Sequence, residues 1–145
     1  ALQELGAEIL FWRVAIKPGR PISVARLGHQ FIFCLPGNPV AVYVCFLLLV
    51  KPVLAILSGG DPAQEKEYHF PCDFAYNKKK GRTEFVRVVI RTDAQGMQRA
   101  FLHGRKGAGV ISSLLGADGV IEVPADADKI ERGTVLKFIP FPHER

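Results

Sequence analysis

The sequence has 145 residues, with 19 Lys and Arg against 14 Asp and Glu, a formal charge of +5 and 48% hydrophobic residues. This length suffices for one ordinary domain or two small ones, and the apolar content excludes a mainly disordered chain. The three cysteines form no C-x-x-C pair, which argues against a disulfide framework or a structural zinc site and favours free thiols in a reducing cytoplasm.

The first sixty residues are predicted to form an α/β unit in which strands pack with a buried helix. In chain order we expect the end of a helix at Leu2–Leu5 closed by Gly6, a strand at Ile9–Ile16, a turn at Lys17–Pro21, strands at Ile22–Leu27 and Phe31–Leu35, and a helix from Pro39. That helix includes Val40–Leu57, an apolar stretch with one charge, Lys51. Because Lys51 and Pro52 lie near its middle, we favour a buried helix over a membrane span.

A turn-rich segment, Ser58–Pro62, separates this unit from residues 61–145. The second unit shows short strands between turn signals, the pattern of a small all-β barrel or sandwich. Strands are expected near Tyr68–Ala75, Thr83–Arg91, Met97–His103, Gly119–Val123 and Thr134–Ile139, with a short helix at Val110–Leu115.

The turn Pro36-Gly-Asn-Pro39 joins an apolar strand directly to the long helix. Asn38 suits the N-cap position and Pro39 the first helical position. Unpaired backbone N–H groups and the helix dipole would favour a phosphate or oxyanion, and Gly37 would let it approach closely. The alternative is an ordinary capped turn with no ligand.

A group of cations precedes that turn. On one continuous strand Arg13 and Lys17 would point to the same face, and Arg20 follows across a proline-glycine turn. No carboxylate occurs from Arg13 to Gly60, so these cations would be available to an external anion. The alternative is a solvated basic turn.

Weaker signals lie in the second unit. Gly104–Gly109 combines glycines with two cations, and Arg87 and Arg91 are spaced to share one strand face. Both patterns are also common in plain turns and surfaces. The histidine spacing fits no metal motif, and no G-x-S-x-G or Walker A sequence occurs, so the catalytic residues stay unknown and no metal site is predicted within this chain.

Several of these segments resemble the molybdopterin molybdenumtransferase family, which includes MoeA and the C-terminal part of gephyrin. The resemblance lies in Lys17-Pro-Gly-Arg-Pro21, Leu35-Pro-Gly-Asn-Pro-Val40, Gly81-Arg-Thr-Glu-Phe-Val-Arg87 and the glycine-rich Gly104–Ser113. It covers nearly the whole chain. It implies that residues 1–60 are the C-terminal part of an α/β molybdopterin-binding domain and that residues 61–145 are a C-terminal β-barrel domain.

The resemblance also implies a function in molybdenum cofactor biosynthesis. Family members hydrolyse adenylylated molybdopterin and insert molybdenum from molybdate into molybdopterin, assisted by Mg²⁺. The acidic magnesium-binding segment would precede Ala1, so this chain would be incomplete for catalysis. The expected assembly is a homodimer, and whether molybdenum or tungsten is handled stays open.

By the same resemblance, Lys17, Arg20 and Pro21 match the basic loop at the molybdate and phosphate site. Arg87 matches an arginine of the barrel domain that faces the same cleft, and Asn38 falls in the P-G-N-P turn. Ala41 and Ala108 stand where serine is common. Each missing hydroxyl would weaken oxyanion binding by about 1.5–3 kcal/mol if it met the charged group.

Two other functions remain open. One is a nucleic-acid-binding module that uses the β-barrel and Lys78-Lys-Lys-Gly-Arg82, although twelve acids in the same unit and the lack of interleaved aromatic residues argue against it. The other is a scaffold like gephyrin, in which the barrel docks a partner peptide.

Overall fold

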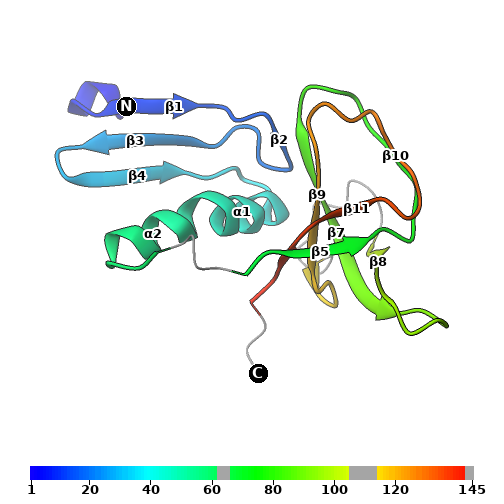
Figure 1. Ribbon diagram of the computed structural model, residues 1–145. Coiled ribbons are helices and arrows are strands. Elements are labelled where there is room, and N and C mark those ends of the chain that lie inside the picture. Colours follow the sequence, from blue (N-terminus) through cyan, green and yellow to red (C-terminus); the bar gives the residue numbers. More distant parts are fainter. Residues whose placement is uncertain (62–65, 105–113, 143–145) are drawn as a thin grey trace. The chain divides into compact units, whose positions relative to one another are not determined.

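The computed structural model describes residues 1–61, 66–104 and 114–142. They belong to two compact units, Ala1–Gln64 and Glu65–Arg145, which Figure 1 colours along the sequence from blue to red. The first unit is mixed α/β and the second is strand-rich.

The first unit contains a three-stranded antiparallel sheet. Its strands β1 (Glu8–Trp12), β3 (Ser23–Leu27) and β4 (Gln30–Cys34) lie in the order β1-β3-β4. Strands β3 and β4 lie within one residue of their predicted bounds. The 3₁₀ helix η1 (Gln3–Leu5) precedes the sheet and ends at Gly6, whose φ of 82° confirms the predicted glycine cap.

The strand predicted over Ile9–Ile16 is interrupted, which corrects one inference from the sequence. Strand β1 ends at Trp12 because Arg13 has a φ of 64°, in the left-handed region, and only the short strand β2 (Ile16–Lys17) follows. Side chains alternate between faces only along a continuous strand. The expectation that Arg13 and Lys17 share one strand face is therefore wrong.

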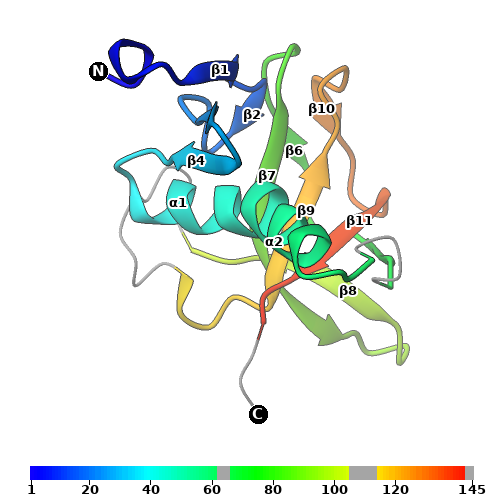
Figure 2. The same ribbon diagram turned by 90° about the vertical axis from the view of Figure 1, so that its left-hand side faces the viewer.

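One helical run extends over Pro39–Leu57, as predicted (Figure 2). It consists of α1 (Pro39–Cys45), the π-helical segment η2 (Phe46–Val50) and α2 (Lys51–Leu57). The wider π turn, in which the Lys51 N–H donates to the Phe46 carbonyl, directly precedes Pro52. Because proline lacks an N–H and its ring crowds the carbonyl four residues earlier, it disfavours regular α-helical bonding at this point.

The helix is buried along only part of its surface. Its buried residues are Val40, Ala41, Val44, Cys45 and Leu47, whereas Phe46, Leu54, Ile56 and Leu57 are exposed. By length and composition alone the helix could cross a membrane, which is weak evidence, because the core helix of a soluble domain passes the same test. Because its N-terminal half packs into the unit, we interpret it as a core helix.

The second unit is built from strands near the predicted positions. They are β5 (Tyr68–Pro71), β6 (Tyr76–Asn77), β7 (Thr83–Thr92), β8 (Gln98–Leu102), β9 (Gly119–Val123), β10 (Lys129–Ile130) and β11 (Val135–Pro140). The first half of β7 pairs with β9 and its second half with β8, while β11 pairs with both β9 and β5. Strands β6 and β10 form a separate short ladder.

The core of this unit is apolar, and its fully buried members are Cys72, Val88, Ala100, Ile121 and Val123. Beyond β5, an isolated bridge joins Cys72 to Ala100 of β8, where the Asp73 N–H donates to the Ala100 carbonyl at 2.8 Å. Closure of the strands into a barrel stays a prediction. Residues 110–113 of the helix predicted at Val110–Leu115 lie outside the described residues.

Candidate functional site

Strand register brings three segments of the first unit to one edge of its sheet. Trp12 pairs with Ser23, and Ser23 pairs with Cys34, so these residues form one row across β1, β3 and β4. The chain therefore leaves the sheet at this edge after residue 12, returns before residue 23 and leaves again after residue 34. The predicted site residues of this unit all belong to these connections: Arg13, Lys17, Arg20, Pro21, Gly37 and Asn38.

The basic turn, Lys17–Pro21, is held by buried residues on its inner side. Ile22, which follows it, is fully buried, and its N–H donates to the Gly19 carbonyl at 3.1 Å. The Cys45 thiol of α1 also donates to that carbonyl, with the sulfur 3.7 Å from the oxygen. A Cβ added at Gly19, whose φ is 112°, would collide with Cys45 Sγ. The glycine is therefore required for the turn to lie against the helix.

The outer side of the basic turn carries its charges. Lys17, Arg20 and Pro21 are exposed, above the buried Ile16 and Gly19. Among the described residues, Arg20 forms no ion pair, whereas Arg26 of the same unit is paired with Glu8 at 2.8 Å. The turn thus presents cationic side chains from a backbone fixed by α1, an arrangement suited to an anion.

Arg13 lies at the same edge but is oriented by different contacts. Its N–H donates to the Ile22 carbonyl at 3.0 Å, which ties it to the end of the basic turn. Its guanidinium carbon lies 4.5 Å from the centre of the exposed Trp12 ring, within the range of a cation–π contact.

The Pro36–Pro39 turn caps the helix as predicted, with a consequence for the anion site. The Asn38 side-chain oxygen accepts from the N–H groups of Val40 at 2.9 Å and Ala41 at 3.3 Å. Pro39 has no N–H, and the N–H groups of Val40 and Ala41 are bound by Asn38. The expectation of unpaired amides is therefore wrong for residues 39–41. Gly37 is exposed, and a Cβ there would meet no atom within 4 Å, so the backbone at this point is open to approach.

The position of Ala41 changes the expected effect of its missing hydroxyl. Ala41 is only 4% exposed and packs into the interior of the unit. A serine hydroxyl at this position would therefore face the interior and would not meet a ligand at the surface. Ala108, the other departure, lies outside the described residues.

Arg87 belongs to the second unit and lies on β7 opposite Val120 of β9. It is half-buried, and this desolvation lowers the pKa of its guanidinium, which nevertheless stays charged at neutral pH. A Cβ added at Gly104 would lie 3.8 Å from an Arg87 terminal nitrogen. The guanidinium thus lies beside the first residue of the predicted glycine-rich segment, of which residues 105–113 are outside the described part of the chain.

The buried carboxylate of Glu84 was not predicted from the sequence. Glu84, in the stretch Gly81–Arg87, is 4% exposed and accepts a hydrogen bond from the Tyr76 hydroxyl at 2.7 Å. Desolvation, and then the neighbouring carboxylate, raise the pKa of Tyr76. The sequence contained a signal for this burial. Glu84, Val86 and Val88 are spaced two residues apart on β7, so their side chains lie on the same, inward-facing side of the strand.

The lysine run that favoured nucleic-acid binding is partly engaged in structural contacts. The Lys78 ammonium donates to the carbonyls of Ala127 at 2.8 Å and Ala125 at 3.3 Å. Lys80 pairs with Asp128 at 3.4 Å. The Lys78 ammonium is thus directed toward backbone carbonyls, and Asp128 partly offsets the charge of Lys80, which leaves fewer cations of this run for a phosphate backbone.

Other chemistries receive little support from the described residues. Within residues 1–61, 66–104 and 114–142 no group of three or more His, Cys, Asp or Glu side chains is placed to hold a metal ion. Burial raises the pKa of the Cys45 and Cys72 thiols to about 11, which disfavours the nucleophilic thiolate at neutral pH.

Two family models match most of the chain. Residues 1–56 match a model described as a probable molybdopterin binding domain, and residues 70–141 match the MoeA C-terminal region, domain IV. Curated relatives include a molybdopterin molybdenumtransferase of Haemophilus influenzae, 31% identical over 99% of this chain and 36% of the relative, and one of Bacillus subtilis, 31% identical over 94% and 32%. The chain thus spans about a third of the length of these relatives.

Solved structures agree with these matches. A molybdenum cofactor biosynthesis protein of Pyrococcus furiosus is 35% identical, with a TM-score of 0.74 over 92% of this chain and 45% of its own. A molybdopterin biosynthesis MoeA protein of Pyrococcus horikoshii is 30% identical, with a TM-score of 0.75 over 92% of this chain and 32% of its own.

Proposed function

Because the chain belongs to the molybdopterin molybdenumtransferase family, we propose that it is the C-terminal part of an enzyme of molybdenum cofactor biosynthesis. In this proposal the enzyme binds adenylylated molybdopterin and molybdate and inserts molybdenum into molybdopterin. Residues 1–60 belong to its molybdopterin-binding domain, and residues 61–145 form its C-terminal domain.

The observation that carries the proposal is the basic turn at the edge of the first sheet. Lys17 and Arg20 are exposed on a turn whose backbone is anchored through Gly19 to Cys45. Both substrates are anions, and charge-assisted hydrogen bonds from lysine and arginine are among the strongest contacts that a protein offers to phosphate and oxyanions. The function of the turn is therefore to bind and orient an anion.

The other predicted residues have narrower roles in this proposal. Asn38 fixes the start of the helix beside the open backbone of Gly37 and does not itself leave helical amides for the ligand. Pro21 shapes the end of the basic turn, and Arg13 adds a cation at the same sheet edge. Arg87 stays a predicted ligand residue of the second unit.

Magnesium requires hard oxygen ligands, commonly carboxylates, in octahedral geometry. The described residues hold no such cluster, so they do not fit a magnesium site and no magnesium-dependent step is assigned to them. The proposal accordingly places the magnesium-holding acids outside the described residues and limits these residues to binding and orientation.

The proposal is tested by titrating the chain with molybdate and with adenylylated molybdopterin in a calorimeter. Replacing Lys17 by alanine is expected to weaken binding by about ten-fold or more, because a charge-assisted contact is worth about 1.5–3 kcal/mol. Lys51→Ala, which removes an exposed lysine from the helix of the same unit, is the matched control. Equal affinities of the Lys17→Ala variant and the unaltered chain would refute the assignment, and Arg87→Ala tests the second unit by the same criterion.

We also propose that the protein is a homodimer, as the resemblance implies. The first unit exposes large apolar side chains that an interface would cover, among them Trp12, Leu54, Ile56 and Leu57. Light scattering coupled to size-exclusion chromatography should give twice the chain mass, whereas a monomer at all concentrations would contradict the proposal.

A further inference from the structure

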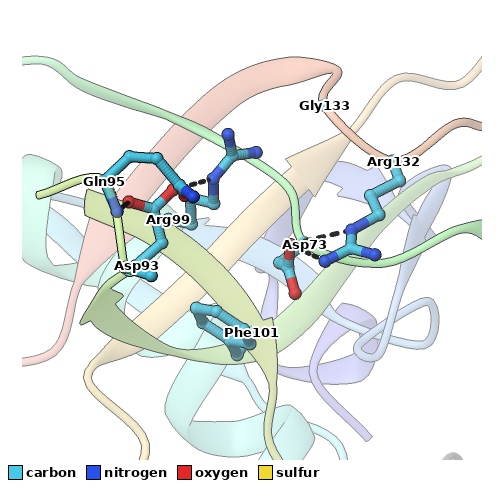
Figure 3. Close-up of a pocket in the computed structure, with 8 residues that line it drawn as sticks. Asp73, Asp93, Gln95, Arg99, Phe101, Arg132 and Gly133 are labelled. Atoms are coloured by element: carbon cyan, nitrogen blue, oxygen red, sulfur yellow. Dashed lines mark hydrogen bonds and ion pairs between the residues drawn. The ribbon is translucent and has the colours of Figure 1, made fainter. Parts of the chain in front are cut away.

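The second unit contains an open pocket of about 540 Å³ that the proposed function does not use (Figure 3). It is lined by residues of the β7–β8 turn, of β8 and of the segments that follow β5 and β10. The lining side chains that matter are Asp73, Asp93, Arg99, Phe101 and Arg132. Its volume falls in the usual range for ligand sites.

Two aspartates orient two arginines around this pocket. Asp93 accepts from Arg99 Nε at 2.6 Å, and Asp73 accepts from Arg132 Nε at 2.8 Å. Figure 3 shows the two ion pairs as separate groups, with the Phe101 ring below them. Each guanidinium is thus held through its Nε side, a geometry that fixes the direction of its remaining donors.

The remaining hydrogen-bonding capacity of the pocket consists mainly of donors. Both oxygens of Asp93 already accept hydrogen bonds, because the one that does not bind Arg99 accepts from the backbone N–H groups of Gln95 at 3.0 Å and Met97 at 2.8 Å. Within the described part of the chain, the two terminal nitrogens of Arg99 and one of Arg132 have no hydrogen-bond partner. A ligand that supplies acceptors would satisfy them.

A third arginine increases the positive charge at this site. Arg91 pairs directly with Arg99 across β7 and β8, and its guanidinium carbon lies 5.9 Å from the centre of the Phe101 ring. Like charges directly opposite each other destabilise an antiparallel ladder. Counting Arg91, the site has one more cation than anion, so a bound anion would relieve this repulsion.

We propose that this pocket binds an acidic peptide segment. Acidic side chains of the peptide accept from the terminal nitrogens of Arg99 and of Arg132, and a neighbouring apolar side chain packs on Phe101. The openness of the pocket favours a peptide lying across it over a small molecule, which needs an enclosing wall. A surplus of one cation suits a single carboxylate better than the successive phosphates of a nucleic acid, which need several cations.

Fluorescence polarisation tests this with a labelled six-residue peptide of alternating glutamate and phenylalanine. The chain is expected to bind it, with binding at least ten-fold weaker for Arg132→Ala, which removes a proposed contact. Binding should weaken to a smaller extent for Arg91→Ala, which removes only a neighbouring charge. Both arginines are exposed, and Arg91→Ala leaves the two ion pairs intact, so neither change should unfold the unit. Arg26→Ala removes an exposed, carboxylate-paired arginine from the other unit and serves as the matched control.

The outcomes separate the alternatives. Weaker binding in the two pocket variants, retention in Arg26→Ala and failure of the glutamine version of the peptide would support the proposal. No binding by the unaltered chain, or equal loss in all three variants, would overturn it. Competition by free phenylacetate or by a single-stranded oligothymidine as effective as the unlabelled peptide would overturn it in favour of a small carboxylate or a nucleic acid.

Discussion

Replacing Gly19 by alanine is expected to lower the free energy of unfolding of the first unit by about 2–5 kcal/mol. Two costs combine. A non-glycine residue at a φ of 112° is strained, and its Cβ would collide with Cys45 Sγ and crowd Ile16 Cδ1, which lies 3.2 Å away. Urea denaturation followed by circular dichroism and by Trp12 fluorescence measures the change.

Two further variants isolate the cause. Gly28 also has a positive φ, of 59°, but its added Cβ would meet no atom within 4 Å, so Gly28→Ala should cost only the backbone strain of about 1–2 kcal/mol. Cys45→Ala removes the colliding sulfur, so the double variant should be less destabilised than the sum of the two single variants. Equal effects at Gly19 and Gly28, or strict additivity with Cys45, would show that the contact with α1 does not hold the turn.

Replacing Tyr76 by phenylalanine is expected to lower the free energy of unfolding of the second unit by about 1.5–3 kcal/mol at neutral pH. The variant deprives the buried Glu84 carboxylate of the hydroxyl that donates to it at 2.7 Å. Tyr68→Phe is the matched control, because Tyr68 is exposed and its hydroxyl has no hydrogen-bond partner among the described residues. A loss of the same size in both variants would contradict the role of this pair.

The Tyr76 variant should also change the dependence of stability on pH. Burial and Glu84 hold the pKa of Tyr76 above the ordinary tyrosine value of about 10. Above pH 10 the unfolded chain therefore loses the phenolic proton while the folded chain retains it, so the folded state loses stability as pH rises. The stability difference between the unaltered chain and Tyr76→Phe should shrink above pH 10, and a constant difference would refute the linkage.

Much of the fold could be predicted because its helix start and strand bounds are set by interactions between residues that are close in the sequence. Asn38 followed by Pro39 specifies a helix start, and the apolar run behind it specifies the helix to Leu57. Arg13 could not be foreseen in the same way. Its neighbours are strand formers, and its left-handed φ goes with a long-range bond to Ile22 that no local pattern encodes.

The sequence predicted which residues belong to the candidate site better than it predicted how they are arranged. The sequence identified the cations of the basic turn, but only the fold shows that Gly19 lies against Cys45, 26 residues away. It identified Asn38 as a cap, yet the cap itself occupies the amides that were expected to be free. The burial of Glu84 could be predicted from the alternation of side chains along β7. Its hydrogen bond with Tyr76 could not, because that contact depends on how the chain folds between residues 76 and 84.

The most direct test of the account is the affinity of molybdate for Arg20→Ala compared with Arg26→Ala. Both variants lose one exposed arginine from the first unit, but only Arg20 lies on the basic turn, and Arg26 is paired with Glu8. Calorimetric titration should give binding about ten-fold weaker for Arg20→Ala and within about two-fold of the unaltered chain for Arg26→Ala. Equal affinities of the two variants would contradict the claim that the basic turn binds the anion.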